Sequence, residues 1–448
     1  MNSSYLRRYI VEPIYYTLNK SPRLRYWKHL ESTQNLSTDE LIQKQWNRLQ
    51  SLIRFVYRYN KFYRVRFEQA GLHPSDIRTH RDITLLPVLT KEEIKKNLYD
   101  MISDGYQMEN LLKFKTGGST GKALELFITE ECSELRNACA RRHDRWSGWE
   151  VGEPIGAVWG NPVLPSSIKS KLREWLLYPM IYLDTMNLND YSVTKFAKDW
   201  IRVKPTLLFG HAHSIFVLAE YVRKLEIKTI KPRGILSTSM MLMPHERHTI
   251  EEVFGIKVID RYGCEEVSLI ASECERHEGM HLNIEHLYIE FIKEDGSPAV
   301  SGEIGRIIVT DLMNMAMPFI RYQVDDMGIP IDKKCSCGRG LPLMDKVIGR
   351  TADFLIRQDG SRVAGVSLIE NTLTKIPGIE QMQIIQDSLD RIILNVVKDM
   401  EYKDATDQSL RGYFQDLFGS NCNIIINLVQ EIRPEKSGKY RFSICNII

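Results

Sequence analysis

Glycines, hydroxyl side chains and a lysine cluster in residues 113–127, which read KFKTGGSTGKALELF. Glycines let backbone N–H groups approach a phosphate, and the hydroxyls of Thr116, Ser119 and Thr120 add donors. Lys122 adds a mobile positive charge. This segment therefore predicts a phosphate-binding loop, with an unliganded polar hairpin loop as the alternative.

The spacing of this loop differs from that of a Walker loop. A Walker loop has four residues between its glycines and a Ser or Thr directly after its lysine. Here three residues separate Gly117 from Gly121, and Ala123 follows the lysine. We therefore expect a nucleotide to be held in a different manner from that of a P-loop ATPase.

Two neighbouring carboxylates follow a short predicted strand in residues 260–268, DRYGCEEVS. We expect them at the start of a helix. Because neighbouring residues of a helix cannot share one face, either Glu265 or Glu266 should point inward, where it could bind Mg²⁺. A solvated acidic cap is the alternative.

Three further segments carry charges beside apolar strands or glycines. In PFIRYQVDDMG, residues 318–328, an aspartate could accept both hydroxyls of a ribose. In residues 347–363, Arg350 could reach a nucleotide and form a hinge together with Asp353. In residues 433–445, a lysine follows a glycine in a basic loop. A charged turn and a solvated tail are the alternatives for the first and last of these segments.

A cysteine and histidine pattern predicts a metal site. CSCG at residues 335–338 brings two thiols together, and ECERHEGMH at residues 273–281 adds a third thiol and two histidines. Three thiols and a histidine form a credible Zn²⁺ set. Free thiols in loops are the alternative.

The elements that would position these residues indicate an α/β fold. Apolar runs alternate with helical patterns over residues 155–260, which predicts βα units and a largely parallel sheet. After residue 349 the pattern becomes that of a small α+β module. We therefore predict a large N-terminal α/β domain with mixed sheets, residues 1–349. A hinge joins it to a small C-terminal domain, residues 350–448.

Composition narrows the class of protein. The chain has 448 residues, 43% hydrophobic and 26% charged, with a net charge of +3. This composition favours a globular enzyme and gives no indication of nucleic acid as a partner. We expect no signal peptide or stable membrane span, and the eight scattered cysteines favour the reducing cytoplasm. The apolar run Trp175–Leu183, after the basic stretch Lys169–Arg173, favours a buried helix edge over contact with a membrane surface.

Together, the five polar segments resemble, in order, the motifs of the adenylate-forming superfamily, which includes acyl-CoA synthetases, luciferase and adenylation domains. The set is more similar to the phenylacetate–CoA ligase branch, and within it to ligase-like proteins encoded with capsular polysaccharide genes. The likeness extends from about residue 40 to the C-terminus.

The resemblance implies a role for each matching residue. The loop would hold the phosphates of ATP, Tyr262 and Gly263 would lie beside adenine, and Glu266 would act in catalysis near Mg²⁺. Asp326 and Arg350 would contact the ribose, Asp353 would be the hinge, and Lys439 would be the catalytic lysine. The loop residues concerned are Thr116, Ser119, Thr120, Gly121 and Lys122.

The branch also carries a similar cysteine and histidine arrangement. This favours a structural zinc site, with His277 as a substitute for His281. The four preferred ligands are Cys274, His281, Cys335 and Cys337.

The implied activity is an ATP-dependent, AMP-forming ligation of a small carboxylic acid through an acyl-adenylate. The acceptor is an amine, giving an amide in surface polysaccharide biosynthesis, or alternatively coenzyme A. A non-catalytic nucleotide-binding scaffold is the hypothesis from another class. His211 and His213 either line the acyl pocket or are hydrogen-bonded polar groups near a loop.

Overall fold

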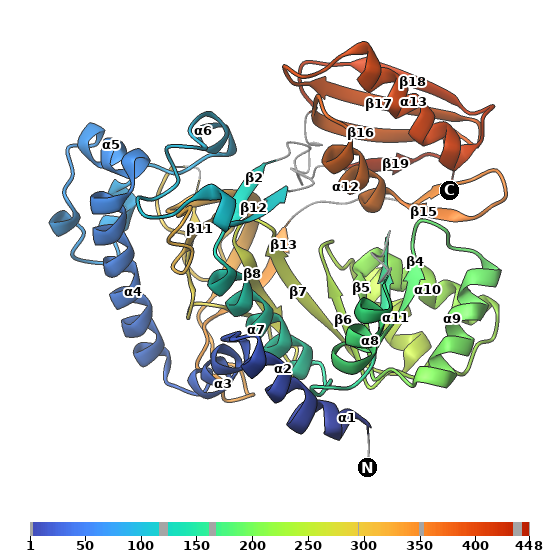
Figure 1. Cartoon of the computed structure of the whole chain (residues 1–448), viewed down its shortest axis with the longest axis horizontal. Coiled ribbons are helices and arrows are strands. Elements are labelled where there is room, and N and C mark those ends of the chain that lie inside the picture. Colours follow the sequence, from blue (N-terminus) through green and yellow to red (C-terminus); the bar gives the residue numbers. More distant parts are fainter. Residues whose placement is uncertain are drawn as a thin grey trace.

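An eleven-stranded mixed sheet forms the centre of the large N-terminal part of the chain (Figure 1). The computed structural model describes residues 3–115, 124–160, 167–293, 295–348, 354–432 and 441–447. From edge to edge the strands are β10 (Leu287–Ile292), β11 (Gly305–Asp311), β12 (Tyr322–Ile331), β13 (Leu343–Ile348), β9 (Met280–Leu282), β8 (Ser268–Glu273), β7 (Val258–Cys264), β6 (Gly234–Thr238), β5 (Leu207–His211), β3 (Ile155–Trp159) and β4 (Met180–Asp184).

The two halves of this sheet differ in strand direction. Strands β3 to β7 pair in parallel, as the alternating pattern predicts, because a helix connects each of them to the next and returns the chain to the same end. Strands β8 to β13 pair antiparallel, with β8 joined to β7. The predicted mixed α/β class is confirmed. The helices beside this sheet are α7 (Glu130–Trp146), α8 (Ile168–Leu177), α9 (Asp190–Val203), α10 (Ala212–Lys224) and α11 (Pro244–Phe254).

Capping residues set the helix boundaries in the N-terminal region. Ser37 and Glu40 form a capping box before α4, and Thr90 forms another box with Glu93 before α6. Helices α4 and α5 follow each other directly and are separated at Asn60. The elements of this region are α1 (Ser3–Leu6), the π-helix η1 (Arg7–Val11), α2 (Glu12–Leu18), α3 (Arg23–Thr33), α4 (Thr38–Tyr59), α5 (Lys61–Gln69), α6 (Lys91–Lys96), and the short 3₁₀ turns η2 (Pro74–Asp76), η3 (Asp82–Leu85) and η4 (Met108–Asn110).

A small α+β domain occupies the C-terminal part of the chain (Figure 1). Its sheet has the order β18-β17-β16-β19, and helices α12 and α13 share a buried cluster with it. The predicted small α+β module after residue 349 is confirmed. Its elements are β14 (Phe354–Ile356), β15 (Arg362–Ala364), α12 (Gly365–Lys375), β16 (Ile379–Ser388), β17 (Arg391–Lys398), α13 (Asp404–Phe418), β18 (Asn423–Leu428) and β19 (Ser443–Cys445).

Close packing joins this small domain to the carboxyl ends of β3 and β4. The Thr185 hydroxyl lies 3.4 Å from the Ser367 hydroxyl, and Met186 belongs to the apolar cluster of the small domain. A Cβ atom at Gly160 would lie 1.9 Å from Oγ of Ser367. Glycine at position 160 is therefore required for this approach of the two domains.

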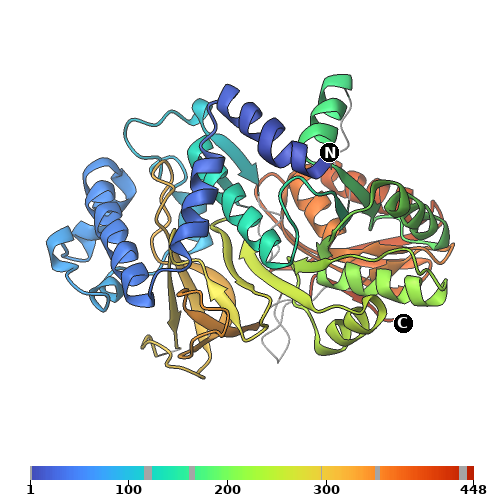
Figure 2. The ribbon, with the colours of Figure 1, turned by 90° about the horizontal axis from the view of Figure 1, so that it is seen from below.

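Helix α8 corrects one expectation about burial. The apolar run Trp175–Leu183 divides between the end of α8 and strand β4, and the Trp175 side chain is 62% exposed rather than buried at a helix edge. Figure 2 shows α8 and the N-terminal helices along one edge of the molecule. Among the helices formed by the described residues, none is both long enough and apolar enough to cross a membrane.

Candidate functional site

The carboxyl ends of the parallel strands form one edge of the sheet, which is where open α/β sheets bind ligands. The register of the strands, together with the contact between the rings of Trp159 and His211, places five residues in one row along this edge. In spatial order they are Asp184, Trp159, His211, Thr238 and Arg261. Tyr262 follows directly on β7.

A hydrogen bond joins the second and third predicted motifs. The Tyr262 hydroxyl on β7 donates to Oδ2 of Asp326 on β12, at 2.9 Å. Asp326 is buried, although 64 residues separate it from Tyr262 in the sequence. At Gly263 the pairing of β7 with β8 shifts register, and a Cβ atom there would lie 2.5 Å from the Ser268 carbonyl oxygen. The backbone geometry thus requires glycine directly after the tyrosine.

The two neighbouring carboxylates lie in a β-hairpin turn, so the predicted helix start is wrong. Residues 265–267 connect β7 to β8, because Cys264 pairs with Ser268 across an antiparallel turn. The expectation that one of the two side chains points inward is confirmed. Glu265 is exposed, whereas Glu266 is 6% exposed.

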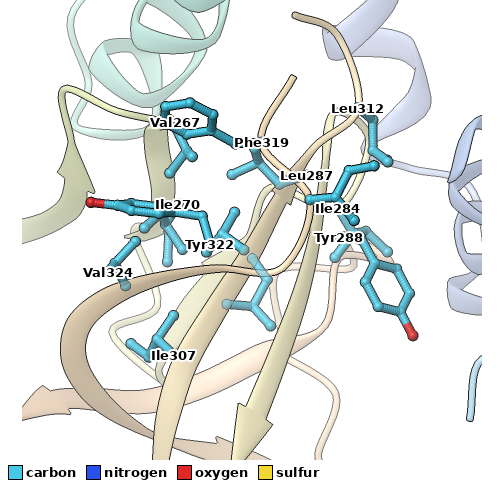
Figure 3. Packing of buried hydrophobic residues seen from close by; sticks show 14 of the residues in the cluster. Val267, Ile270, Ile284, Leu287, Tyr288, Ile307, Leu312, Phe319, Tyr322 and Val324 are labelled. Atoms are coloured by element: carbon cyan, nitrogen blue, oxygen red, sulfur yellow. The ribbon is translucent and has the colours of Figure 1, made fainter. Parts of the chain in front are cut away.

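Buried partners fix the position of Glu266. Its Oε1 accepts a hydrogen bond from the Tyr322 hydroxyl at 3.1 Å and lies 3.7 Å from Nζ of Lys91. Tyr322 is completely buried and packs among apolar residues that include Val267 and Ile270 (Figure 3). The hydrophobic cluster therefore holds the hydroxyl that orients this carboxylate.

Sequence reasoning did not identify Lys91 or Tyr322 as partners of Glu266. Lys91 is the first residue of α6, where the capping box predicts the helix but nothing about the target of the lysine. Tyr322 begins strand β12. Both contacts join residues that are far apart in the sequence, so no local pattern could have indicated them.

His211 is a buried polar group at the same edge. Its ring centre lies 3.9 Å from that of Trp159, and burial lowers its pKa to about 4. Neither ring nitrogen has a hydrogen-bond partner among the described residues. His213 differs, because its Nδ1 contacts the buried Glu246 carboxylate. Of the two alternatives for these histidines, His213 is the hydrogen-bonded polar group, whereas the ring nitrogens of His211 remain able to form hydrogen bonds.

Several predicted site residues lie outside the described part of the chain. The described flanks of the predicted phosphate loop pair as strands β1 (Leu112–Lys115) and β2 (Glu125–Ile128), with Lys115 opposite Glu125. The predicted residues that lie outside are Thr116, Ser119, Thr120, Gly121, Lys122, Arg350, Asp353 and Lys439.

The predicted metal ligands come together in a tight cluster. Their candidate ligand atoms all lie within 4.8 Å of one another. Sγ of Cys274 lies 3.7 Å from Sγ of Cys335, and Sγ of Cys337 lies 3.3 Å from Nε2 of His281. Tetrahedral zinc with Zn–S bonds of about 2.3 Å requires a sulfur–sulfur separation of roughly 3.8 Å. The cluster therefore fits a four-coordinate zinc ion.

The histidine of this cluster is oriented for metal binding. Nδ1 of His281 lies 3.2 Å from the carbonyl oxygen of Leu341, so a proton on Nδ1 leaves the lone pair of Nε2 facing the cluster. Burial lowers the pKa of His281 to about 4, which keeps the ring neutral at pH 7. His277 lies outside the cluster, with Nδ1 3.5 Å from Oε2 of Glu273. The geometry thus favours His281 over His277 as the fourth metal ligand.

The metal cluster and Glu266 lie at opposite ends of β8. Glu266 precedes Ser268, the first residue of this strand, and Cys274 follows Glu273, the last. At about 3.3 Å per residue, the strand separates the two positions by roughly 20 Å. A metal in the cluster could not contact a substrate held beside Glu266.

Comparison with solved structures defines the fold as that of the adenylate-forming ligases. A crystal structure of 2-hydroxyisobutyryl-CoA ligase in the postadenylation state, in complex with R3-HIB-AMP, matches with a TM-score of 0.61 and 18% identity. The match covers 93% of this chain and 91% of that chain. The same ligase in the thioesterification state, in complex with 2-HIB-AMP and CoA, gives a TM-score of 0.62, also at 18% identity, and covers 92% and 91% of the two chains.

Sequence comparisons give more specific relatives. Residues 355–446 match the CapK C-terminal domain family. The chain is 24% identical to Protein CapK of Staphylococcus aureus over 441 residues, or 94% of each chain. It is 26% identical to phenylacetate-coenzyme A ligase of Escherichia coli (strain K12) over 337 residues, which cover 73% of this chain and 75% of that one. These matches confirm the predicted likeness to the phenylacetate–CoA ligase branch and show a likeness to Protein CapK over most of the chain.

Proposed function

We propose that this protein is an ATP-dependent, AMP-forming ligase that activates a small carboxylic acid as an acyl-adenylate. The observation that carries the proposal is the hydrogen bond between Tyr262 and Asp326 at the carboxyl edge of the sheet. It joins a predicted adenine-binding motif to a predicted ribose-binding motif in one place. The whole-chain fold and the ligase relatives support the same reaction.

Charge explains the roles that we assign. A carboxylate that attacks the α-phosphate of ATP meets an anion, so positive charge must already be in place. Lys439 supplies this charge between the carboxylate and the α-phosphate, and the loop at residues 116–122 holds the other phosphates. Glu266 offers a buried carboxylate to Mg²⁺, which would neutralise the leaving pyrophosphate. Arg350 contacts the ribose, and Asp353 is the hinge between domains 1–349 and 350–448.

The acid lies along the row of residues that ends in Arg261. Among the described residues, Arg261 has one buried nitrogen, Nε, without a hydrogen-bond partner, but its guanidinium pairs with Asp144, whereas both ring nitrogens of His211 lack a partner. We assign His211 to the acid pocket, between the aromatic ring of Trp159 and Thr238 on the neighbouring strand.

We propose an amine as the acceptor, which gives an amide in surface polysaccharide biosynthesis. The likeness to Protein CapK covers 94% of the chain, and the C-terminal domain matches the CapK type. The likeness to the phenylacetate-coenzyme A ligase of Escherichia coli covers 73%. Coenzyme A is the second candidate, because the structural relative was solved with CoA.

A pyrophosphate-release assay over a panel of carboxylic acids tests the activity. Lys439→Ala should lower the rate of adenylate formation by about 100- to 1000-fold, and Lys436→Ala in the same loop is the matched control. Equal rates in the two variants would refute the assigned lysine. Mass spectrometry after addition of coenzyme A or amines identifies the acceptor, and no activity on any acid would favour the nucleotide-binding scaffold.

We further propose a structural zinc ion, bound by Cys274, His281, Cys335 and Cys337 in a cytoplasmic protein. Burial raises the pKa of Cys274, and a bound cation would supply the positive charge that a buried thiolate needs. None of the eight cysteines forms a disulfide, which suits the reducing cytoplasm. Metal analysis should find one zinc per chain, and absence of zinc with no effect of a chelator would end this proposal.

A further inference from the structure

Helix α8 presents an apolar stripe to solvent. Ile168, Leu172 and Trp175 are spaced by four and three residues, so they lie on one face of the helix. They are 87%, 54% and 62% exposed, respectively. Scattered exposed apolar residues are ordinary, but a continuous helical stripe that includes tryptophan indicates an interaction surface.

The N-terminal helical stretch, residues 3–18, carries a second exposed set. Its large apolar side chains recur at helical spacing and are more than 40% exposed. These residues are Tyr5, Leu6, Tyr9, Ile10, Ile14 and Leu18. Two of the six are tyrosines, which together with tryptophan are the residues enriched where proteins meet the interface of a bilayer.

The two helical stretches lie against each other. The guanidinium carbon of Arg7 lies 6.0 Å from the ring centre of Trp175, and the hydroxyls of Tyr16 and Tyr178 form a hydrogen bond. Arg23 also donates to the Tyr178 hydroxyl at 2.7 Å. Figure 2 shows both stretches at one edge of the molecule, with α8 projecting beyond it. We call this surface, formed by residues 3–29 and 167–177, the basic apolar edge.

The charge of the basic apolar edge differs from that of the remainder of the chain. Its two segments contain nine Lys or Arg and two Asp or Glu, whereas all other residues include 51 basic and 55 acidic ones. One of its two acids, Glu12, is buried and paired with Arg141. Lys169, Lys171 and Arg173 on α8 are exposed. Arg8, Arg23 and Arg25 pair with glutamates outside the edge, so the positive charge beside the apolar stripe comes chiefly from α8.

We propose that the basic apolar edge binds the surface of a bilayer that contains anionic lipids, with its helices lying in the interface. Amphipathic helices of this kind bury aromatic and aliphatic side chains among the headgroups, while lysines and arginines meet anionic lipids. A second copy of the chain is a poorer occupant. A symmetric dimer would bring the same positive surface against itself and cause repulsion.

Vesicle flotation with the full-length protein tests the proposal. The protein should bind vesicles of phosphatidylcholine with 30% phosphatidylglycerol and should bind pure phosphatidylcholine vesicles at least tenfold more weakly. Neutralising Lys169, Lys171 and Arg173 together to Gln should weaken binding roughly 100-fold, because each cation near such a surface contributes about a factor of five to ten. Leu172→Asp with Trp175→Asp should weaken it at least tenfold.

Matched variants on other exposed surfaces serve as controls. Lys375→Gln, Arg391→Gln and Lys398→Gln remove three exposed cations from the small domain, and Val300→Asp with Met400→Asp replaces two exposed apolar residues. These controls should bind the vesicles as the unaltered protein does, and every variant should keep its melting temperature.

Tryptophan quenching and sedimentation give independent readouts. Brominated lipid should quench the fluorescence of the unaltered protein more than that of Trp175→Phe. Absence of binding to anionic vesicles overturns the proposal, as does equal binding to both vesicle types. A dimer that is broken by Trp175→Asp, with no vesicle binding, overturns it in favour of a second copy.

Discussion

The two ends of strand β8 hold polar clusters of opposite kinds. At one end, three thiols and a neutral imidazole form a compact group whose ligand atoms all face one another. At the other end, the turn at Glu266 brings a carboxylate beside a lysine and a tyrosine hydroxyl. The first cluster contains a full set of four metal ligands within the described residues, whereas we propose that the second binds Mg²⁺ through Glu266.

This difference indicates that the metal cluster contributes to stability and that Glu266 contributes to the reaction. A zinc ion in the first cluster would join the hairpin of β8 and β9 to the β12–β13 connection, because its ligands come from both. Hydrophobic packing around Tyr322 holds the second cluster, so we expect its carboxylate to bind and release a ligand without loss of the fold. Changes at the first end should therefore act on stability, and changes at the second end on rate.

Cys274→Ser should have the largest effect, because it removes a ligand from the compact cluster. Structural zinc sites contribute about 10 kcal/mol or more to folding in small domains, so we expect loss of zinc and a fall in the melting temperature of tens of degrees. Elemental analysis and thermal unfolding measure both. Cys445→Ser, in the small domain, should retain zinc and melt normally. Normal zinc content and a normal melting temperature in the Cys274 variant would contradict a stabilising role for the metal cluster.

Glu266→Gln should have the opposite outcome, with a lower reaction rate and little change in stability. The amide keeps the shape of the side chain but loses the charge that we assign to Mg²⁺, so adenylate formation should fall about 100- to 1000-fold while the melting temperature stays within a few degrees. The rate of pyrophosphate release measures the loss. Glu265→Gln, one residue away and exposed, should react normally. Equal rates for the two variants would remove Glu266 from the chemistry.

His211→Asn should change the pH dependence of stability. Burial lowers the pKa of His211 to about 4, whereas an unfolded histidine has a pKa of about 6.5. Between these values the unfolded chain binds the extra proton, so the free energy of unfolding falls by about 1.4 kcal/mol for each pH unit lost. The variant should lack this contribution in urea titrations from pH 7 to pH 5. The exposed His248→Asn serves as control, and an unchanged slope at position 211 would show that the ring is not buried as neutral imidazole.

Tyr322→Phe should have the smallest effect of the four. Phenylalanine preserves the packing but removes the hydrogen bond to Glu266, which should lower the rate of adenylation about tenfold. Tyr288→Phe provides a matched change in the same hydrophobic cluster, because its hydroxyl donates to the carbonyl oxygen of His80 at 3.3 Å. If both variants react at the same rate, the hydroxyl of Tyr322 does not orient the carboxylate.

Local patterns predicted most of the elements of this fold. The alternation of apolar runs and helical patterns over residues 155–260 depends on neighbours in the sequence, and the parallel pairing that it predicts is confirmed. The turn at Glu266 was misread because a strand followed by two acids is equally consistent with a helix start. Only the antiparallel pairing of Cys264 with Ser268, a tertiary preference of the sheet, distinguishes the two.

The candidate site was predictable where residue chemistry is distinctive. Three cysteines and a histidine predict the metal cluster, and geometry selects His281 over His277. The contacts of Lys91 and Tyr322 with Glu266 were not predictable, because their sequence separations of 175 and 56 residues leave no local signal. The exposure of Trp175 was missed for a related reason, since an apolar run alone does not reveal which side of a helix meets the protein.

Gly160 has a consequence for the packing of the two domains during the reaction. With the Ser367 hydroxyl 1.9 Å from where a Cβ would stand, a single methyl group there would act as a wedge between the domains. Alanine at this position would therefore disfavour the packing of Ser367 against Thr185. With the hinge that we propose at Asp353, it would weaken the reaction step that needs this arrangement of the two domains.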